Sequence, residues 1–388
     1  MRFITLEPEE FRKFAEKSPY KSFMQTPELA SYREKNGWVP YYFGVERNNK
    51  LVAATMLIAK PTFLGKSTYY APGGPIIDFE DEELLDFFIK NLKRYAKSHN
   101  GYILHIDPYY ELIERDRYGE IKEGGFSHQQ ALKNLRKLGF IEIKNPGQPK
   151  YLFALDFKKH TADQIFADMK RNTRNHIRKA EKMGVKVREL NREELGIFKK
   201  ITESTSNRRN FTDRPLSYYQ QMYDLFHPRG EVKFMLAEVS EDTLSRSIIA
   251  DGAIAERPSP VTTGARERSE KDVSLIPLSV GMFITYGNEV IYLFSGSDEK
   301  YMKEYNAQYL IQWHMIKYAL GHKFKTYNFY GIQGLPDKSS KDYGIYDFKK
   351  GFTSDETGRV IELIGSYELP INIPFYHLHQ LLSKLKNH

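Results

Sequence analysis

Hydrophobic and polar positions in the first third of the chain follow two different periods, which predicts a mixed α/β unit. Residues 41–46 and 51–59 are strand-like runs on either side of an Arg-Asn-Asn-Lys turn, a pattern that indicates a hairpin. A glycine-rich break, Pro-Gly-Gly-Pro, separates this hairpin from the next element. Residues 82–98 then carry apolar side chains at helical spacing, and 102–106 is a short apolar strand that ends at Asp107.

The same order of elements recurs in the last third of the chain. A hairpin is followed by a glycine break, by a helix over 307–320 and by a short strand. Gly74 in the first glycine break lies 33 residues before Asp107, and Gly296 in the second lies 34 residues before Tyr330. The matched spacing favours a duplicated α/β unit, although ordinary α/β alternation produces a similar order.

A strongly basic segment, residues 170–188, lies between the two units and holds eight Lys or Arg residues and one acidic residue. We expect a helix over 165–183, with its apolar face turned to the core and its basic face turned outward. The apolar positions are Ile165, Met169, Ile177 and Ala180, and the basic positions are Arg171, Arg174, Arg178 and Lys182. Such a row neutralises RNA phosphates, but a solvated basic helix face explains the same pattern.

Residues 240–275 interrupt the second unit with an abrupt change of composition. The segment contains no Phe, Tyr or Trp, has five basic and seven acidic residues, and follows neither a helical nor a strand period. We therefore expect a poorly ordered insertion. The runs on either side, 233–239 and 277–286, have the pattern of strands that pair directly with each other.

Composition and charge exclude several classes of function. The 388-residue chain has 58 Lys and Arg, 50 Asp and Glu and a net charge of +8, which permits an acidic partner without identifying one. It has no cysteine, which excludes disulfides, a thiol nucleophile and Cys-ligated zinc. No apolar run is long enough to cross a membrane, and the first eight residues lack the apolar core of a signal peptide. We therefore expect a cytoplasmic globular protein.

Two clusters carry candidate chemistry, since the sequence has no nucleotide-binding loop, serine elbow or metal-spaced histidine pair. Asp107 closes an apolar strand at the end where α/β folds bind ligands, and a carboxylate there can accept a proton. A turn-capping role explains Asp107 equally well. Lys349 lies among aromatic residues in 343–352, where a lysine can bind phosphate or stabilise an oxyanion. The same alternation also fits an ordinary half-buried strand.

Nine segments spread over nearly the whole chain form a recognisable set: MQTPELASYREKNGW (24–38), YYAPGGPIID (69–78), YILHIDP (102–108), RNTRNHIRKAEKMGVKV (171–187), FTDRPLSYY (211–219), VIYLFSGSD (290–298), YNFYGI (327–332), IYDFKKGF (345–352) and ELPINIPFYHLHQLL (368–382). Together they resemble the FemABX-type aminoacyltransferases, a family that uses aminoacyl-tRNA to add bridge amino acids to bacterial cell-wall precursors. Each segment is modest alone, whereas their order and spacing together are specific.

The resemblance implies an α/β fold of two tandem GNAT-like acyltransferase domains, with a poorly ordered insertion where relatives carry a coiled-coil arm. The first domain is expected over 1–150, with 365–388 packing back on it, and the second over 151–364. The resemblance also implies tRNA, not coenzyme A, as the acyl carrier, and the sequence has no visible coenzyme A pyrophosphate loop. Neither a cofactor nor a metal is expected.

The resemblance also implies roles for individual residues. Lys349, with Phe348, is placed at the tRNA acceptor end and the oxyanion, and Asp107 orients or deprotonates the attacking amine. The expected precursor-binding residues are Lys35, Arg214, Tyr102, Tyr218 and Tyr292, and the expected tRNA-binding residues are Arg171, Arg174, Arg178 and Lys182. Lysine and arginine suit a diphosphate, and arginine can bind its oxygens in bidentate fashion.

The implied partners are an aminoacyl-tRNA and a cell-wall precursor, either lipid II or the nucleotide-linked UDP-MurNAc-pentapeptide. The closing Pro-Ile-Asn segment resembles the lipid-linked branch of the family. A lipid-linked acceptor implies peripheral contact with the inner face of the cytoplasmic membrane. Two alternatives remain open: a GNAT-like N-acyltransferase that uses acyl-CoA or another acyl donor, and a non-catalytic RNA-binding protein that uses the basic helix.

Overall fold

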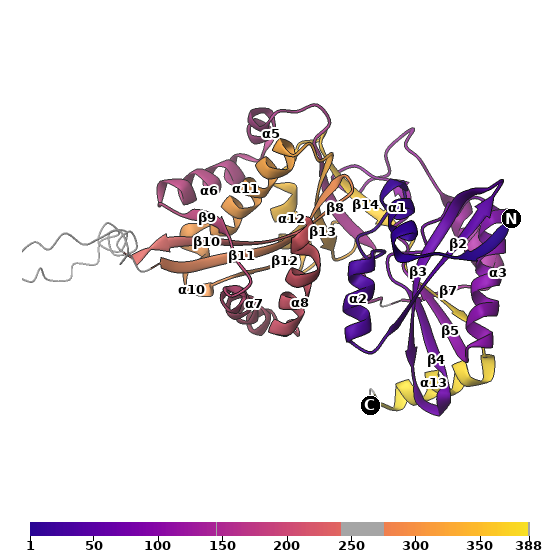
Figure 1. The fold of residues 1–388 in the computed structure, drawn as a ribbon. Coiled ribbons are helices and arrows are strands. Elements are labelled where there is room, and N and C mark those ends of the chain that lie inside the picture. The colour runs from indigo at the N-terminus through magenta and orange to yellow at the C-terminus, as the bar shows by residue number, and fades with distance from the viewer. Residues whose placement is uncertain (145, 242–274, 387–388) are drawn as a thin grey trace, which may run out of the picture.

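The computed structural model describes residues 1–144, 146–241 and 275–386, which form two mixed β-sheets with helices on both faces of each sheet (Figure 1). The predicted insertion over 240–275 lies almost wholly outside the described residues. Within the described part of the chain, no helix is long and apolar enough to cross a membrane.

In the described chain, seven strands make up the first sheet. In spatial order they are β1 (Arg2–Thr5), β2 (Val39–Arg47), β3 (Lys50–Pro61), β4 (Ser67–Ala71), β5 (Gly101–Ile106), β15 (Tyr367–Pro370) and β7 (Ile141–Glu142). One face of this sheet is covered by α1 (Pro8–Lys17) and α2 (Pro27–Lys35), and the other by α3 (Glu82–Ser98) and α4 (Gln129–Lys137). The helix α13 (Ile373–Lys386) packs against β5.

Eight strands of the described chain make up the second sheet. In spatial order they are β9 (Lys186–Glu189), β10 (Val232–Ser240), β11 (Leu275–Tyr286), β12 (Glu289–Ser297), β13 (Thr326–Ile332), β8 (Tyr151–Asp156), β14 (Gly358–Leu363) and β6 (Glu111–Glu114). The helices on one face are α5 (Ala162–Asp168), α6 (Arg171–Lys182), α11 (Ala307–Gly321) and α12 (Tyr343–Lys350), and those on the other are α7 (Leu195–Arg209) and α8 (Leu216–Phe226). The short α10 (Glu299–Tyr305) follows β12.

The two sheets repeat one topology, which explains the repeated order of elements in the sequence. From β1 and from β9, three antiparallel pairings lead to one parallel pairing, β4 with β5 or β12 with β13. A helix, α3 or α11, connects the two parallel strands in each case. Antiparallel pairings then complete each sheet. The strand order therefore confirms the predicted repeat of an α/β unit.

The structure corrects how the hairpins of the two units correspond. The spacing predicts that the hairpin over 41–59 matches the hairpin over 279–294, but β11 and β12 occupy the positions of β3 and β4. The counterpart of β2 is therefore β10, which pairs with β11 directly, as the sequence predicts for the strands on either side of the insertion. The two glycine breaks still correspond, because each lies at or after the end of the first strand of the parallel pair.

Each sheet includes one strand from the part of the chain that forms the other sheet. The strand β6 lies between β5 and β7 in the sequence but pairs with β14 at the edge of the second sheet. The strand β15 follows β14 in sequence but inserts into the first sheet between β5 and β7. Main-chain hydrogen bonds of β6 and β15 therefore tie the two halves together.

The basic segment forms two short helices where the sequence predicts one. The helix α5 ends at Asp168, Met169 is extended, and α6 begins at Arg171. The predicted apolar positions Ile165, Met169, Ile177 and Ala180 are nevertheless all buried.

The segment around Lys349 is helical. Residues 343–350 form α12, so the alternative of a half-buried strand is wrong. Tyr346 and Lys350 are buried together with Lys349, which places the aromatic and basic side chains on a helix packed against β8 and β13.

Candidate active site between the two halves

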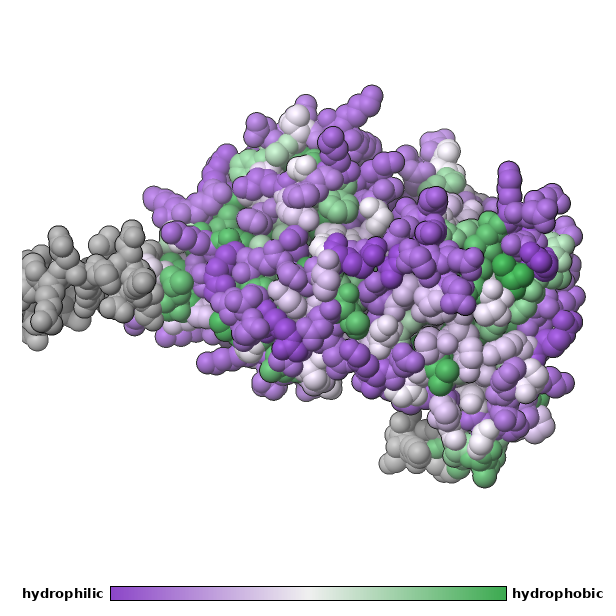
Figure 2. All heavy atoms as spheres, viewed as in Figure 1, coloured by the Kyte–Doolittle hydropathy of each residue, from purple (hydrophilic) through white to green (hydrophobic). Residues whose placement is uncertain are grey.

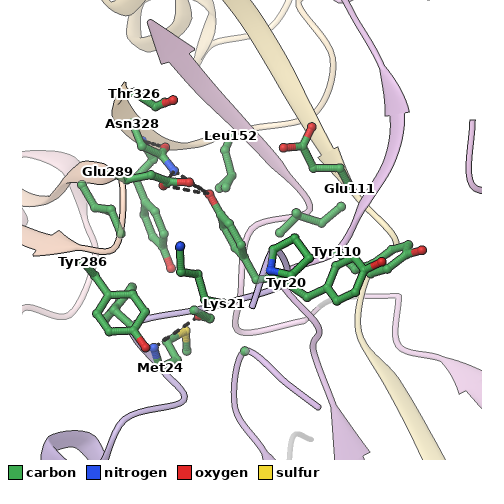
Figure 3. A pocket seen from close by; sticks show the side chains of 18 of the residues that line it. Tyr20, Lys21, Met24, Tyr110, Glu111, Leu152, Tyr286, Glu289, Thr326 and Asn328 are labelled. Atoms are coloured by element: carbon green, nitrogen blue, oxygen red, sulfur yellow. Dashed lines mark hydrogen bonds between the residues drawn. The ribbon is translucent and has the colours of Figure 1, made fainter. Parts of the chain in front are cut away.

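A pocket of about 470 Å³ lies between the two halves of the molecule (Figure 3). Its walls come from the turn over 19–24, the loop after β5, and the starts of β12 and β13. Asp107 and Tyr330 both line it, so the two strand ends that have matched spacing in the sequence meet at one cavity. The lining combines aromatic side chains with charged and polar ones, and a concave pocket with convergent polar groups is a usual form of a ligand site.

Asp107 is held at the end of β5 by two hydrogen-bond donors. The hydroxyl of Tyr70, on β4, donates to Oδ2, and the backbone N–H of Gly73 donates to Oδ1. Gly73 has a φ of +64°, and a Cβ there would lie 2.5 Å from Oγ of Ser22, so the turn requires glycine. Burial raises the pKa of Asp107 to about 7, against the opposing effect of the two hydrogen bonds. The carboxyl is therefore partly ionised at neutral pH.

Arg33, near the end of α2, is a candidate binding residue that sequence reasoning missed. Its positive charge lowers the pKa of Asp107 and that of Tyr218 on α8, although burial raises both pKa values overall. Its guanidinium carbon lies 6.0 Å from the ring centre of Trp38, and its buried Nε has no hydrogen-bond partner within the described residues. A buried donor without an acceptor is costly, so Arg33 is suited to an anionic group of a ligand.

Arg214 and Tyr218, both predicted to bind the precursor, lie together beside Arg33. The guanidinium carbon of Arg214 lies 5.5 Å from the ring centre of Tyr218, which packs edge-on against Tyr32 of α2 at 5.4 Å. The charges of both arginines lower the pKa of Tyr218, so cations from the two halves converge on this ring. Lys35, also predicted to bind the precursor, is exposed at the last position of α2.

Lys349 is buried on α12 and does not line the pocket. Its Nζ donates to the carbonyl oxygen of Gly331 at 2.5 Å and to that of Tyr330 at 3.3 Å. An ammonium has three donors, so one N–H remains for a ligand. Burial lowers the pKa of Lys349 to about 7. The neighbouring Phe348 packs against Tyr309 of α11, with 4.9 Å between ring centres.

Tyr330 stands between the pocket and Lys349. The pairing of β13 with β8 shifts register between Asn328 and Gly331, and Tyr330 within this bulge has a φ of +62°. Its hydroxyl donates to Oε1 of Gln148 at 2.9 Å on the pocket side, and its carbonyl faces Lys349. A bulky residue in the left-handed region is uncommon, and such strain tends to collect at functional sites.

A buried carboxylate, Glu289 at the start of β12, also lines the pocket. It accepts hydrogen bonds from the hydroxyl of Tyr109 at 3.0 Å and from Nδ2 of Asn328 at 3.0 Å. Figure 3 shows Glu289 and Asn328 pointing toward each other from adjacent strands. Burial raises the pKa of Glu289. Sequence reasoning missed this group because Tyr109 and Glu289 belong to no quoted segment and meet Asn328 only in the folded chain.

Two tyrosines that the resemblance assigned to the precursor cleft lie away from this pocket. Tyr102 packs against Phe375 of α13, with 4.8 Å between ring centres, and its hydroxyl oxygen accepts from Oγ1 of Thr68. Tyr292 stacks on Phe283 at 5.3 Å within the core of the second half, and its hydroxyl oxygen accepts from Gln308. Neither lines the cavity between the halves.

The predicted tRNA-binding residues divide into two groups. Arg171, Arg178 and Lys182 are exposed on α6. Arg174 is half-buried, and its Nη1 donates to the backbone carbonyls of Ala167 and Met169, the latter at 2.6 Å. Arg174 therefore satisfies carbonyls at the end of α5, which is a structural role in addition to its charge.

Comparison with known proteins places the whole chain in one family. The sequence matches the FemAB family over residues 6–259 and 255–384. It is 32% identical over 426 residues to the aminoacyltransferase FemA of Staphylococcus aureus strain bovine RF122 / ET3-1, and 31% identical over 425 residues to that of strain MRSA252. Both alignments cover 100% of this chain and 99% of the relative.

Among solved structures, the crystal structure of FemX superposes with a TM-score of 0.78 at 22% sequence identity. The match covers 97% of this chain and 99% of FemX. This likeness shows that the chain has the fold of FemX, and the repeated sheet topology confirms the prediction of two tandem α/β units. The family match over residues 6–259 and 255–384 and the full-length identity to the FemA proteins lead to one conclusion: the chain belongs to the FemAB family.

Proposed function

We propose that this acyltransferase moves an aminoacyl group from an aminoacyl-tRNA to an amine on the peptide stem of a peptidoglycan precursor. The amine nitrogen attacks the ester carbonyl carbon, the new C–N bond forms, and the C–O bond to the ribose breaks. One proton leaves the amine and one reaches the departing ribose oxygen. The observation that carries the proposal is that both groups act on Tyr330: burial and the charge of Asp107 raise the pKa of the Tyr330 hydroxyl, and the Tyr330 carbonyl oxygen accepts a hydrogen bond from Nζ of Lys349.

Asp107 is the candidate proton acceptor for the attacking amine. Its pKa of about 7 makes it a stronger base than an ordinary carboxylate, yet it is still substantially ionised at neutral pH. Its hydrogen bonds from Tyr70 and Gly73 fix the carboxyl in the pocket. Burial and the charge of Asp107 raise the pKa of Tyr70 well above its usual value, so that hydroxyl stays a donor.

Lys349 is the candidate stabiliser of the tetrahedral intermediate. An ammonium in a buried site stabilises a developing oxyanion more strongly than it does in water, because little solvent screens the charge. Two of its N–H groups are held by the carbonyls of Tyr330 and Gly331, so the third has a defined direction. The ring of Phe348 beside it offers an apolar surface for the end of the donor.

The exposed basic face of α6 is the candidate contact for the donor tRNA. His176, on the same helix, lies 4.6 Å from Tyr309 between ring centres, and Tyr309 in turn contacts Phe348. A single aromatic residue therefore separates α6 from Phe348. A tRNA whose backbone phosphates bind Arg171 and Arg178 would bring its acceptor end toward Lys349. The affinity of this contact should fall as the salt concentration rises.

The anionic part of the acceptor is assigned to the cations around Tyr218. Arg214, just before α8, and Arg33, on α2, approach this ring, and Lys35 lies at the end of α2. Arginine binds phosphate and carboxylate oxygens through paired N–H groups. We therefore assign the diphosphate or a stem carboxylate to this cluster, with the reacting amine at Asp107.

A lipid-linked acceptor would place the protein against a membrane, and one surface suits this contact. Figure 2 shows apolar side chains over α13, where Leu381 is 61% exposed, and Leu64 in the turn η1 (Phe63–Gly65) is 74% exposed. Phe63 packs against Phe375 of α13 at 4.9 Å, so the turn and the helix form one surface. Flotation with phosphatidylglycerol vesicles should recover the protein, and Leu64→Asp should reduce recovery; equal recovery of both contradicts this contact.

A donor comparison tests the proposed reaction. Purified protein is incubated with a labelled stem-peptide acceptor and either aminoacyl-tRNA or acyl-CoA, in separate reactions. We expect transfer from aminoacyl-tRNA alone, to lipid II or to UDP-MurNAc-pentapeptide. Transfer from acyl-CoA alone would identify a GNAT-like N-acyltransferase. Binding of tRNA without transfer to any acceptor, by folded protein, would favour a non-catalytic RNA-binding protein.

A further inference from the structure

The two candidate catalytic groups belong to different halves of the chain, yet one series of hydrogen bonds joins their surroundings. It starts at Tyr109, in the loop that follows β5, and passes through Glu289 and Asn328 to the backbone of Tyr330. The carbonyl of Tyr330 then accepts a hydrogen bond from Nζ of Lys349. No role in the proposed reaction has so far been assigned to Tyr109, Glu289 or Asn328.

Both the NH₂ group and the oxygen of the Asn328 side-chain amide form hydrogen bonds in this series. Its Nδ2 donates to Glu289 at 3.0 Å and to the hydroxyl oxygen of Tyr109 at 2.9 Å, and its Oδ1 accepts the N–H of Tyr330 at 2.8 Å. The side chain is fully buried. Each donor and the acceptor thus have an assigned partner, so the orientation of the amide is fixed.

The hydrogen bond from Tyr330 to Asn328 acts on a strained part of the backbone. Tyr330 has a φ of +62° within the bulge of β13, a conformation that persists only where neighbouring contacts impose it. If the acceptor on Asn328 is lost, the backbone can relax, and the carbonyls of Tyr330 and Gly331 turn away from Nζ of Lys349.

We propose that Tyr109, Glu289 and Asn328 are positioning residues that hold the peptide of residues 330–331 against Lys349 and thereby aim its free N–H at the reacting ester. They act through the backbone and do not touch the reacting atoms. The proposal rests on the proposed transfer reaction. It adds to that reaction the residues that orient the side chain of Lys349 at the same site.

The pKa of Lys349 depends on this arrangement of hydrogen bonds. Burial is the cause of its low pKa, and no charged side chain of the described residues adds to that shift. Its polar contacts are the carbonyls of Tyr330 and Gly331, which stabilise the charged form. Withdrawing them lowers the pKa of Lys349 further. Glu289 itself faces Arg359 and Glu111 as well as its two hydrogen-bond donors.

The test compares two tyrosines that each contribute one buried hydroxyl. Tyr109→Phe removes the donor to Glu289, whereas Tyr327→Phe removes a hydroxyl that donates to Gln312 at 2.8 Å, outside the series. Asn328→Ala provides a second variant within the series. The pKa of Lys349 is measured by NMR titration of its side chain, which needs no substrate, and kcat, KM and thermal unfolding are measured on the full chain.

We expect Tyr109→Phe and Asn328→Ala to lower the pKa of Lys349 and to reduce kcat about tenfold or more, with both KM values within about twofold. The alkaline limb of the kcat profile should move to lower pH in both. Tyr327→Phe should leave the pKa and kcat unchanged even if it lowers the unfolding temperature.

An unchanged pKa of Lys349 in Tyr109→Phe and Asn328→Ala would overturn the proposal, as would an equal change in Tyr327→Phe. Should Asn328→Ala fail to fold, Tyr109→Phe decides the matter, because it keeps the ring and loses one oxygen. Failure of the wild-type protein to transfer an amino acid would contradict the proposed function, whereas the NMR titration would still decide whether the series positions Lys349.

Discussion

Burial acts on the two candidate catalytic groups in opposite directions. It disfavours the charged form of each, so it raises the pKa of Asp107 and lowers that of Lys349, and both pKa values are about 7. The proposed reaction needs Asp107 ionised and Lys349 protonated. That combination is populated appreciably only in a narrow range around neutral pH.

The pH profile of kcat should therefore be a narrow bell. Activity rises as pH increases through about 7 because Asp107 must lose its proton, and it falls above about 7 because Lys349 must keep one. Lys349→Arg keeps its charge at high pH and should remove the alkaline limb. Lys349→Ala should reduce kcat by about 10²–10³. A flat wild-type profile up to pH 9 would contradict these protonation states.

Arg33→Ala should weaken acceptor binding with little effect on the donor. The loss of one charge-assisted contact should raise the acceptor KM about tenfold or more. Because the Arg33 charge lowers the pKa of Asp107, the acid limb of the profile should also move to higher pH. Lys60→Ala is the matched control, since Lys60 contacts the same Trp38 ring at 5.5 Å from the exposed side. An acceptor KM unchanged in Arg33→Ala would rule out this role.

At the residue scale, the sequence located only the groups that lie at recognisable positions. Asp107 was found because it ends an apolar strand, and Lys349 because aromatic residues surround it in sequence. Arg33, Tyr330 and Glu289 were missed, since their contacts depend on packing between α2 and α8 and on a bulge in β13. A weak signal for Arg33 did exist, because it lies two residues before Lys35 in a segment that carried the family resemblance.

At the scale of elements, the turn after β4 determines where Asp107 can act. The N–H of Gly73 binds the carboxylate, while its positive φ and its contact with Ser22 leave no space for a side chain. The turn is therefore a part of the site and not only a connection between β4 and α3.

Gly73→Ala should impair activity as well as stability, whereas Gly37→Ala should impair stability alone. Gly37 also has a positive φ, of +80°, but a Cβ on Gly37 would have no atom within 4 Å. Both substitutions carry the conformational cost, of about 1 kcal/mol, and Gly73→Ala adds about 1–3 kcal/mol for the steric conflict. Chemical denaturation and kcat of both variants check this. Equal kcat losses would show that Asp107 does not depend on the Gly73 turn.

Local patterns predicted most elements and three of the antiparallel pairings, β2 with β3, β10 with β11 and β11 with β12, but not the pairings between the two halves of the chain. The helix over 82–98 and the hairpin around residues 47–50 follow directly from apolar spacing and turn residues. The segment over 343–352 was ambiguous because aromatic and lysine side chains alternate, and packing against β8 and β13 makes it a helix. The exchange of β6 and β15 has no local signal, since either strand is compatible in pattern with either sheet.

At the scale of the whole molecule, the exchanged strands make each half depend on the other. The first sheet is complete only with β15, which comes from residues 367–370, and without it β5 has an unpaired edge. The site shares this dependence, because its residues come from both halves. The exchange thus couples folding of the whole chain to assembly of the pocket.

A fragment of residues 1–150 should therefore lack a cooperative unfolding transition when expressed alone. Residues 151–388 should be unable to bind the acceptor by themselves, and mixing the two fragments should restore some cooperative unfolding. Circular dichroism melting curves of each fragment and of the mixture provide the measurement. A fragment 1–150 that unfolds as sharply as the full chain would show that β15 is dispensable for the first sheet.

Mass spectrometry of the acceptor after reaction with aminoacyl-tRNA tests the central claim most directly. The wild-type protein should add one aminoacyl mass to the stem peptide, and fragmentation should locate the new amide on the stem amine. Lys349→Ala and Asp107→Asn, with folds verified by their melting curves, should yield little of this product. An unmodified acceptor with the folded wild-type protein, or equal product from all three proteins, would contradict the account.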